Sequence, residues 1–159
     1  MNKRENIQHS LQVLKKFRII YGSVRQHFRE IEAACGVSGS QLWILRETAR
    51  QPGIGVTELA DRLSIHQSTC SQLVDKLAAR NLISKERSKE DQRRVGLCLT
   101  AQAADILKSA PGPAEGILPE ALLAMPESAL LALDSALLEV IGKLRMRDDK
   151  HADSHLSEL

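Results

Sequence analysis

Histidine is the side chain most often used for general acid–base catalysis, and the five histidines of this sequence lie far apart along it. No Ser-His-Asp order, phosphate-binding loop or metalloprotease pattern joins them, so we expect neither an enzyme nor a cofactor. Two pairs, His66 with Cys70 and His151 with His155, have the four-residue spacing of metal ligands on a helix. The third and fourth ligands are missing, and we therefore expect no metal site.

Three cysteines are the other candidates for chemistry: Cys35, Cys70 and Cys98. They form no CxxC pair, and their odd number argues against a disulfide framework. Cys70 falls on the apolar face of a predicted helix and Cys98 on a predicted strand, which leaves Cys35, beside Gly36, as the accessible thiol. A thiol-based redox sensor is therefore one alternative function.

Short polar side chains gather at the start of one predicted helix, over residues 67–80. Cys70, Leu73 and Leu77 share its apolar face, so the polar residues point outward. Helices that read base edges in the major groove carry such side chains near their N-termini. The candidate DNA-reading residues are Gln67, Ser68, Thr69, Ser71 and Gln72.

Basic residues are concentrated in the segment that follows. Residues 80–94 hold six basic and three acidic side chains, whereas residues 100–159 carry a net charge of −5. A local cationic patch suits a polyanion such as DNA. Arg93 suits the narrow minor groove, because a guanidinium is attracted by its negative potential. Lys89 and Arg94 are expected at phosphates.

The elements that position these residues follow from the hydrophobic pattern. Apolar side chains from Ile7 to Ile31 recur every three or four residues, which predicts a long amphipathic helix ending at Gly36. At about 38 Å it is too long for a small domain to cover, so we expect a homodimer. Ser38 or Ser40 caps a second helix. A helix-turn-helix over residues 56–80, with Thr57 as its first cap and Asn81 at its end, precedes a two-stranded wing over residues 82–99.

Thr100 is expected to cap another helix, which the Pro111-Gly112-Pro113 run interrupts. A final helix with an apolar stripe follows Pro126, and residues 148–159 form a polar, flexible tail. The sequence thus predicts one mainly α domain over residues 7–147, a winged helix-turn-helix flanked by dimerisation helices. Residues 1–35 and 101–147 are the flanking helices, and residues 36–100 are the winged helix-turn-helix.

The wing residues resemble a known pattern. Asp91-Gln92-Arg93-Arg94-Val95-Gly96-Leu97-Cys98-Leu99-Thr100 is similar to the wing of the MarR family of bacterial transcription regulators, with Thr57-Glu58-Leu59-Ala60 before the reading helix and Leu77 to Ile83 after it. The resemblance spans about Leu11 to Leu144. It implies a homodimer on a palindromic operator, with Arg93 in the minor groove and Asp91 orienting the wing through an ion pair. The proline break replaces the long unbroken helix typical of this family.

The sequence therefore predicts a cytoplasmic, sequence-specific regulator of transcription that binds double-stranded DNA at a pseudo-palindromic operator and is not a membrane protein. We expect a repressor released by a small aromatic acid, which family members often bind. A flat ring beside arginines suits such a ligand, so the candidate pocket is Tyr21, Arg25, His27, Trp43 and Arg46. A winged helix used only for protein contacts is a further alternative.

Overall fold

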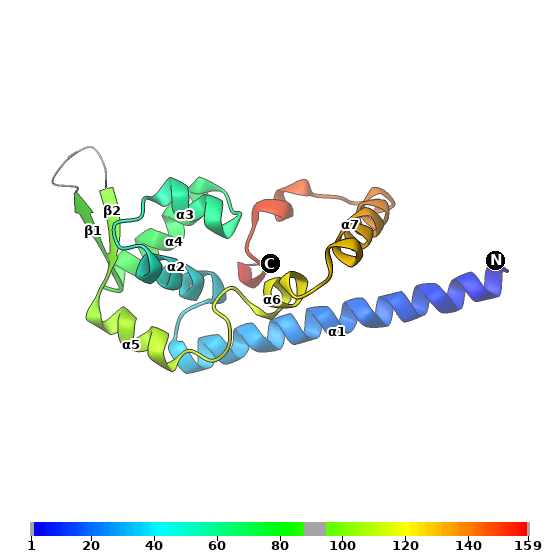
Figure 1. Ribbon diagram of the computed structural model, residues 1–159, viewed down its shortest axis with the longest axis horizontal. Coiled ribbons are helices and arrows are strands. Elements are labelled where there is room, and N and C mark those ends of the chain that lie inside the picture. Colours follow the sequence, from blue (N-terminus) through cyan, green and yellow to red (C-terminus); the bar gives the residue numbers. More distant parts are fainter. Residues whose placement is uncertain (1, 88–94, 159) are drawn as a thin grey trace.

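The computed structural model describes residues 2–87 and 95–158 (Figure 1). Its elements in chain order are α1 (Lys3–Cys35), α2 (Gly39–Arg50), α3 (Val56–Leu63), α4 (Gln67–Ala79), β1 (Ile83–Arg87), β2 (Val95–Leu99), α5 (Ala101–Ser109), α6 (Ile117–Leu123), α7 (Glu127–Gly142), η1 (Asp149–Asp153) and η2 (Leu156–Glu158). The predicted mainly α fold with a two-stranded wing is confirmed. Among the described helices, none combines the length and the apolar character needed to cross a membrane.

The predicted end of α1 is confirmed, and of the two candidate capping residues of α2 the structure shows Ser38. α1 runs for 33 residues and ends at Gly36, whose φ of 67° is the left-handed conformation that glycine adopts without strain. α2 begins after Ser38, whose side chain accepts a hydrogen bond from the Gln41 amide. Figure 1 shows the N-terminal end of α1 extending beyond the rest of the molecule.

The core lies where α2, α3, α4 and the wing meet the C-terminal end of α1. Its fully buried side chains come from these helices, from the wing and from the loop before α3, and they include Ile31, Leu42, Ile44, Leu45, Ile54, Leu59, Val74, Leu77 and Leu97. Burying each such side chain is worth roughly 1.5–3 kcal/mol. The core therefore holds the two short helices and the wing in one rigid head.

The chain after β2 agrees with the prediction in one respect and differs from it in two. The break at Pro111–Pro113 is confirmed, since α5 ends at Ser109 and Gly112 takes a φ of 67°. α6 was not predicted, because seven residues are too few to show a helical period. Residues 148–158 are not a loose tail: they form η1 and η2 and bury His155, because this polar segment finds hydrogen-bond partners on the head.

Candidate nucleic-acid interface

The helix-turn-helix is built by α3, a tight turn and α4. α3 ends at Ser64, which takes the left-handed conformation with φ 52°, and the Ile65 amide then donates to Ala60 O at 3.1 Å. This turn puts the buried Leu63 and Ile65 side chains between the two helices. The prediction that Thr57 caps α3 is wrong, since the capping residue is Gly55 and Thr57 lies in the first turn. Asn81 takes the predicted left-handed conformation, with φ 57°, but it lies one residue beyond Arg80, the capping residue of α4.

The outer face of α4 is polar. Gln67, Ser68 and Gln72 are exposed, and Thr69 and Ser71 are half-buried, whereas Cys70, Leu73, Val74 and Leu77 are buried. All five candidate DNA-reading residues are thus on α4, in its first two turns. A helix whose apolar face is packed in the core and whose exposed face carries amides and hydroxyls suits the major groove of DNA.

The wing is fastened to the loop before α3. β1 and β2 pair antiparallel from Ile83 with Leu99 to Arg87 with Val95. The Gly53 amide donates to Leu97 O at 2.8 Å, and the Leu97 amide donates to Ile54 O at 2.9 Å. The two backbones approach so closely that a Cβ on Gly96 would lie 2.8 Å from the Gly53 Cα. Glycine at position 96 therefore lets the wing lie beside the start of α3.

An ion pair joins the base of the wing to α4. Lys85 Nζ lies 2.5 Å from Asp75 Oδ1, with 43% and 61% of the two side chains exposed. Their separation of ten residues gives no helical or strand spacing that would reveal the pair.

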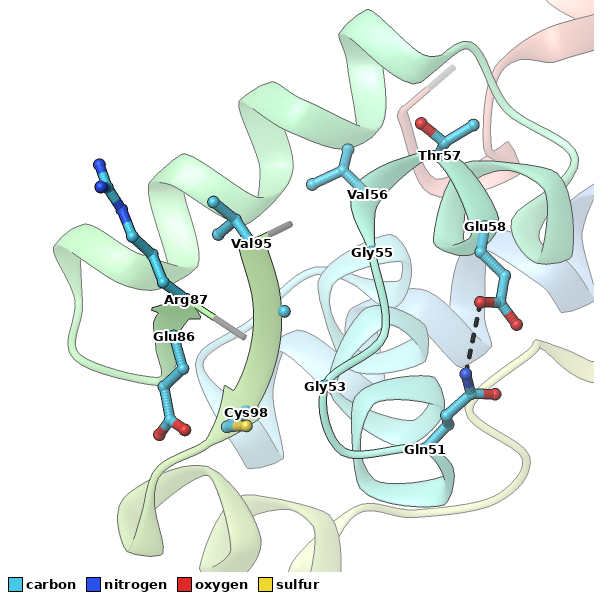
Figure 2. Close-up of a pocket in the computed structure, with 11 residues that line it drawn as sticks. Gln51, Gly53, Gly55, Val56, Thr57, Glu58, Glu86, Arg87, Val95 and Cys98 are labelled. Atoms are coloured by element: carbon cyan, nitrogen blue, oxygen red, sulfur yellow. Dashed lines mark hydrogen bonds between the residues drawn. The ribbon is translucent and has the colours of Figure 1, made fainter. Parts of the chain in front are cut away.

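Between the wing and α3 runs an open groove of about 960 Å³ (Figure 2). Arg87, Glu86 and Cys98 lie on the wing side, and Thr57 and Glu58 lie on the α3 side. Glu58 also accepts a hydrogen bond from Gln51 Nε2 at 3.3 Å.

The four candidate residues of the wing connection, Lys89, Asp91, Arg93 and Arg94, lie outside the described residues. The last described pair of the wing is Arg87 with Val95.

The five candidate ligand residues do not meet in one pocket. Tyr21 is 62% exposed, and the Arg25 guanidinium lies 5.5 Å above its ring. His27 is buried, with Nε2 3.2 Å from Pro113 O. Trp43 is half-buried, and Arg46 is half-buried on the same helix.

Trp43 lines a second cavity, of about 820 Å³, between α2 and the segment around α6. The apolar residues of its lining include Pro119, Leu122 and Leu130. Its charged residues were not predicted from the sequence: Glu47, Arg50, Arg62, Glu115 and Glu120.

The carboxylate of Glu47, only 6% exposed, forms ion pairs with two of the arginines that line the cavity. It pairs with Arg50 at 2.5 Å and with Arg62 at 3.2 Å, and Arg50 also pairs with Glu115 at 3.0 Å. Arg62 also pairs with Glu58. Part of this network has a sequence signal, because Glu47 and Arg50 are three residues apart on a helix and Glu58 and Arg62 are four residues apart.

The thiols are arranged differently from the prediction. Cys35 is buried rather than accessible, because it closes α1 against the core, and Cys98 is the half-buried one. Burial raises the pKa of the Cys35 thiol, and it raises the pKa of the Cys70 thiol to about 11. A thiol with a raised pKa holds little of the reactive thiolate. Within residues 2–87 and 95–158, no three His, Cys, Asp or Glu side chains gather as metal ligands would.

Comparisons with known proteins agree with this geometry. Residues 35–94 match the model of the MarR family. The chain is 28% identical over 95 residues to the HTH-type transcriptional repressor MdtR of Bacillus subtilis, a match that covers 60% of this chain and 57% of the repressor. The fold resembles the transcriptional regulator BldR of Sulfolobus solfataricus, with 25% identity, a TM-score of 0.54 and coverage of 91% of this chain and 100% of BldR.

A cysteine-to-serine mutant of MarR from E. coli, solved in complex with operator DNA, also shares the fold. It is 18% identical, with a TM-score of 0.54, and the match covers 82% of this chain and 96% of that one.

Proposed function

Because this chain belongs to the MarR family of transcriptional regulators, we propose that it binds double-stranded DNA sequence-specifically and represses transcription. The observation that carries the proposal is the position of the exposed polar start of α4 beside a wing fastened at Gly53 and Leu97. α4 reads base edges through Gln67, Ser68, Thr69, Ser71 and Gln72. Arg93 reads the minor groove, Asp91 orients it, and Lys89 and Arg94 bind phosphates.

The test is selection of bound duplexes from a random-sequence pool, followed by affinity measurements on the selected operator. Gln72→Ala should cost on the order of 1–3 kcal/mol on the operator and relax the preference for bases, whereas Lys89→Ala should weaken all duplexes alike and flatten the salt dependence. The exposed Gln102 on α5, changed to Ala, is the matched control. Enrichment of no sequence would contradict the proposal.

We propose a homodimer as the DNA-binding form. Apolar side chains are left exposed on both flanking helices: Ile7, Leu11, Leu14 and Phe17 on α1, and Leu130, Leu131, Leu138 and Ile141 on α7. Covering them with a second copy removes this apolar surface from water, and a two-fold dimer places two heads on a palindrome. Light scattering should give a dimer, and Leu131→Glu should shift it toward monomer; a stable wild-type monomer at micromolar concentration would contradict the proposal.

We propose that a small aromatic acid controls DNA binding from the Trp43 cavity. The half-buried indole of Trp43 and the apolar lining residues supply a surface for the aromatic ring of the ligand. Arg50 and Arg62, which both pair with Glu47, supply cations for its carboxylate. A titration of benzoates and hydroxybenzoates should quench Trp43 and lower operator affinity about tenfold, which corresponds to ~1.4 kcal/mol of coupling. A panel that gives no coupling with DNA would contradict this proposal while leaving the DNA-binding proposal intact.

A further inference from the structure

Residues 148–158, here named the C-terminal segment, return from α7 to the DNA-binding head (Figure 1). They contact α1, α2 and the start of α4 through side chains and backbone. Neither the apolar pattern nor the proposed reading of DNA requires this contact. The segment contacts the head at three places.

The first contact is a buried histidine. His155 is 6% exposed and lies between Phe28 of α1 and Trp43 of α2, with ring centroids 5.4 and 5.6 Å away. Its Nδ1 accepts a hydrogen bond from the Ser157 amide at 3.1 Å. A side chain enclosed by two aromatic rings and locally hydrogen-bonded is an anchor, because undocking exposes all three rings.

The second contact is at the N-terminus of α2. The Ser40 amide donates to Ser157 Oγ at 3.0 Å, and Ser40 Oγ donates to Glu158 Oε1 at 2.5 Å. Ser38, the capping residue of α2, also donates to Glu158, at 3.3 Å. The carboxylate thus sits where the helix leaves amides without partners and where its dipole favours negative charge.

The third contact is at the N-terminus of α4 itself. The amide of His66, the capping residue of α4, donates to Asp153 O at 3.3 Å, and its ring Nε2 lies 3.2 Å from Asp153 Oδ2. The two side chains are 60% and 54% exposed, so this carboxylate stands in solvent directly before Gln67 and Ser68. A DNA phosphate near the start of a reading helix needs the same place and the same positive dipole end.

The C-terminal segment carries four carboxylates, Asp148, Asp149, Asp153 and Glu158, against the single ammonium group of Lys150. We propose that it is an autoinhibitory strap: docked through His155, it holds Asp153 at the N-terminus of α4 and opposes the approach of DNA. This inference rests on the proposed DNA binding. Undocking removes the carboxylate from the reading helix and raises affinity for any duplex, because the repulsion depends on charge and not on sequence.

Two variants of the full chain test the strap on a labelled mixed-sequence 30-base-pair duplex and on a duplex selected from a random pool. Asp153→Asn removes the charge beside His66, and Asp134→Asn, an exposed carboxylate on α7, controls for net charge. His155→Ser removes the anchor, and His151→Ser, an exposed histidine of the same segment, is its control. Trp43 fluorescence reports docking, since Trp43 is the only tryptophan.

We expect Asp153→Asn to tighten binding about threefold on both duplexes beyond its control, the size of one charge at a helix terminus. His155→Ser should shift Trp43 emission to the red and tighten binding about five- to tenfold, a typical coupling between two sites. Unchanged or weaker binding in either variant, or unchanged Trp43 emission in His155→Ser, overturns the strap. Failure of the wild type and all variants to bind any duplex overturns the proposed function instead.

Discussion

Lys85 Nζ contacts Asp75 Oδ1 at 2.5 Å and so ties the first strand of the wing to the outer face of α4. The pair also neutralises a lysine that would otherwise be free to meet a phosphate. Both side chains are largely exposed, which limits their contribution to stability to roughly 0–1 kcal/mol. We therefore expect the Lys85–Asp75 pair to affect DNA binding more than the free energy of unfolding.

The first prediction follows from this pair. Asp75→Asn should leave the melting temperature nearly unchanged and steepen the dependence of log affinity on log salt by about one, because Lys85 becomes available to a phosphate. The measurement is duplex affinity from 50 to 200 mM salt. Asp105→Asn, which frees Lys108 on α5 in the same way, is the control. An unchanged salt dependence in Asp75→Asn would show that Lys85 does not reach DNA.

The second prediction concerns Gly96. A Cβ at this position meets the Gly53 Cα and carbonyl oxygen, both 2.8 Å away, and backbone atoms cannot yield as a flexible side chain can. Gly96→Ala should destabilise the protein by roughly 1–3 kcal/mol and weaken DNA binding by displacing the wing. Gly142→Ala, where no atom lies within 4 Å, should be neutral or slightly stabilising. Urea unfolding and duplex affinity measure the two effects, and equal stability of both variants would contradict the prediction.

The third prediction concerns the carboxylate of Glu47. Glu47→Gln keeps the shape of the side chain but removes the charge that Arg50 and Arg62 share, and we expect the free energy of unfolding to fall by roughly 1–3 kcal/mol. Glu115→Gln removes a more exposed partner of Arg50 and should cost less. Thermal unfolding of both variants provides the comparison, and an equal loss in both would refute the central role of Glu47.

The fourth prediction is a pH dependence of docking. Burial lowers the pKa of His155 to about 4 from an ordinary value of 6.5, an effect that the nearby Glu158 partly opposes. The docked segment therefore excludes a proton that the undocked segment binds. Docking is fully favourable above pH 6.5 and loses up to roughly 3 kcal/mol as the pH falls toward 4.

Trp43 fluorescence followed from pH 7 to pH 4 measures this loss of docking. His155→Phe keeps an aromatic ring between Phe28 and Trp43 but cannot titrate, so its profile should be flat over the same range. A wild-type profile identical to that of His155→Phe would contradict the prediction.

Signals local to the chain account for most of the head. Local signals placed the ends of α1, α2, α4 and α5, because Gly36, Ser38, Asn81 and Thr100 each satisfy terminal backbone groups within a few residues. The apolar period separated the buried Cys70, Leu73 and Leu77 from the polar front of α4. These features depend on neighbours along the chain, so a sequence displays them.

The contacts beside that head depend on how separate elements pack together. The Lys85–Asp75 pair, the Glu47 network with Glu115 and the docking of Asp153 and His155 join residues that are distant in sequence. No period or spacing encodes such contacts, because each depends on how separate elements pack. For the same reason Cys35 turned out buried, Tyr21 and Trp43 did not share a pocket, and a polar terminus that looked unstructured lies folded against the start of the reading helix.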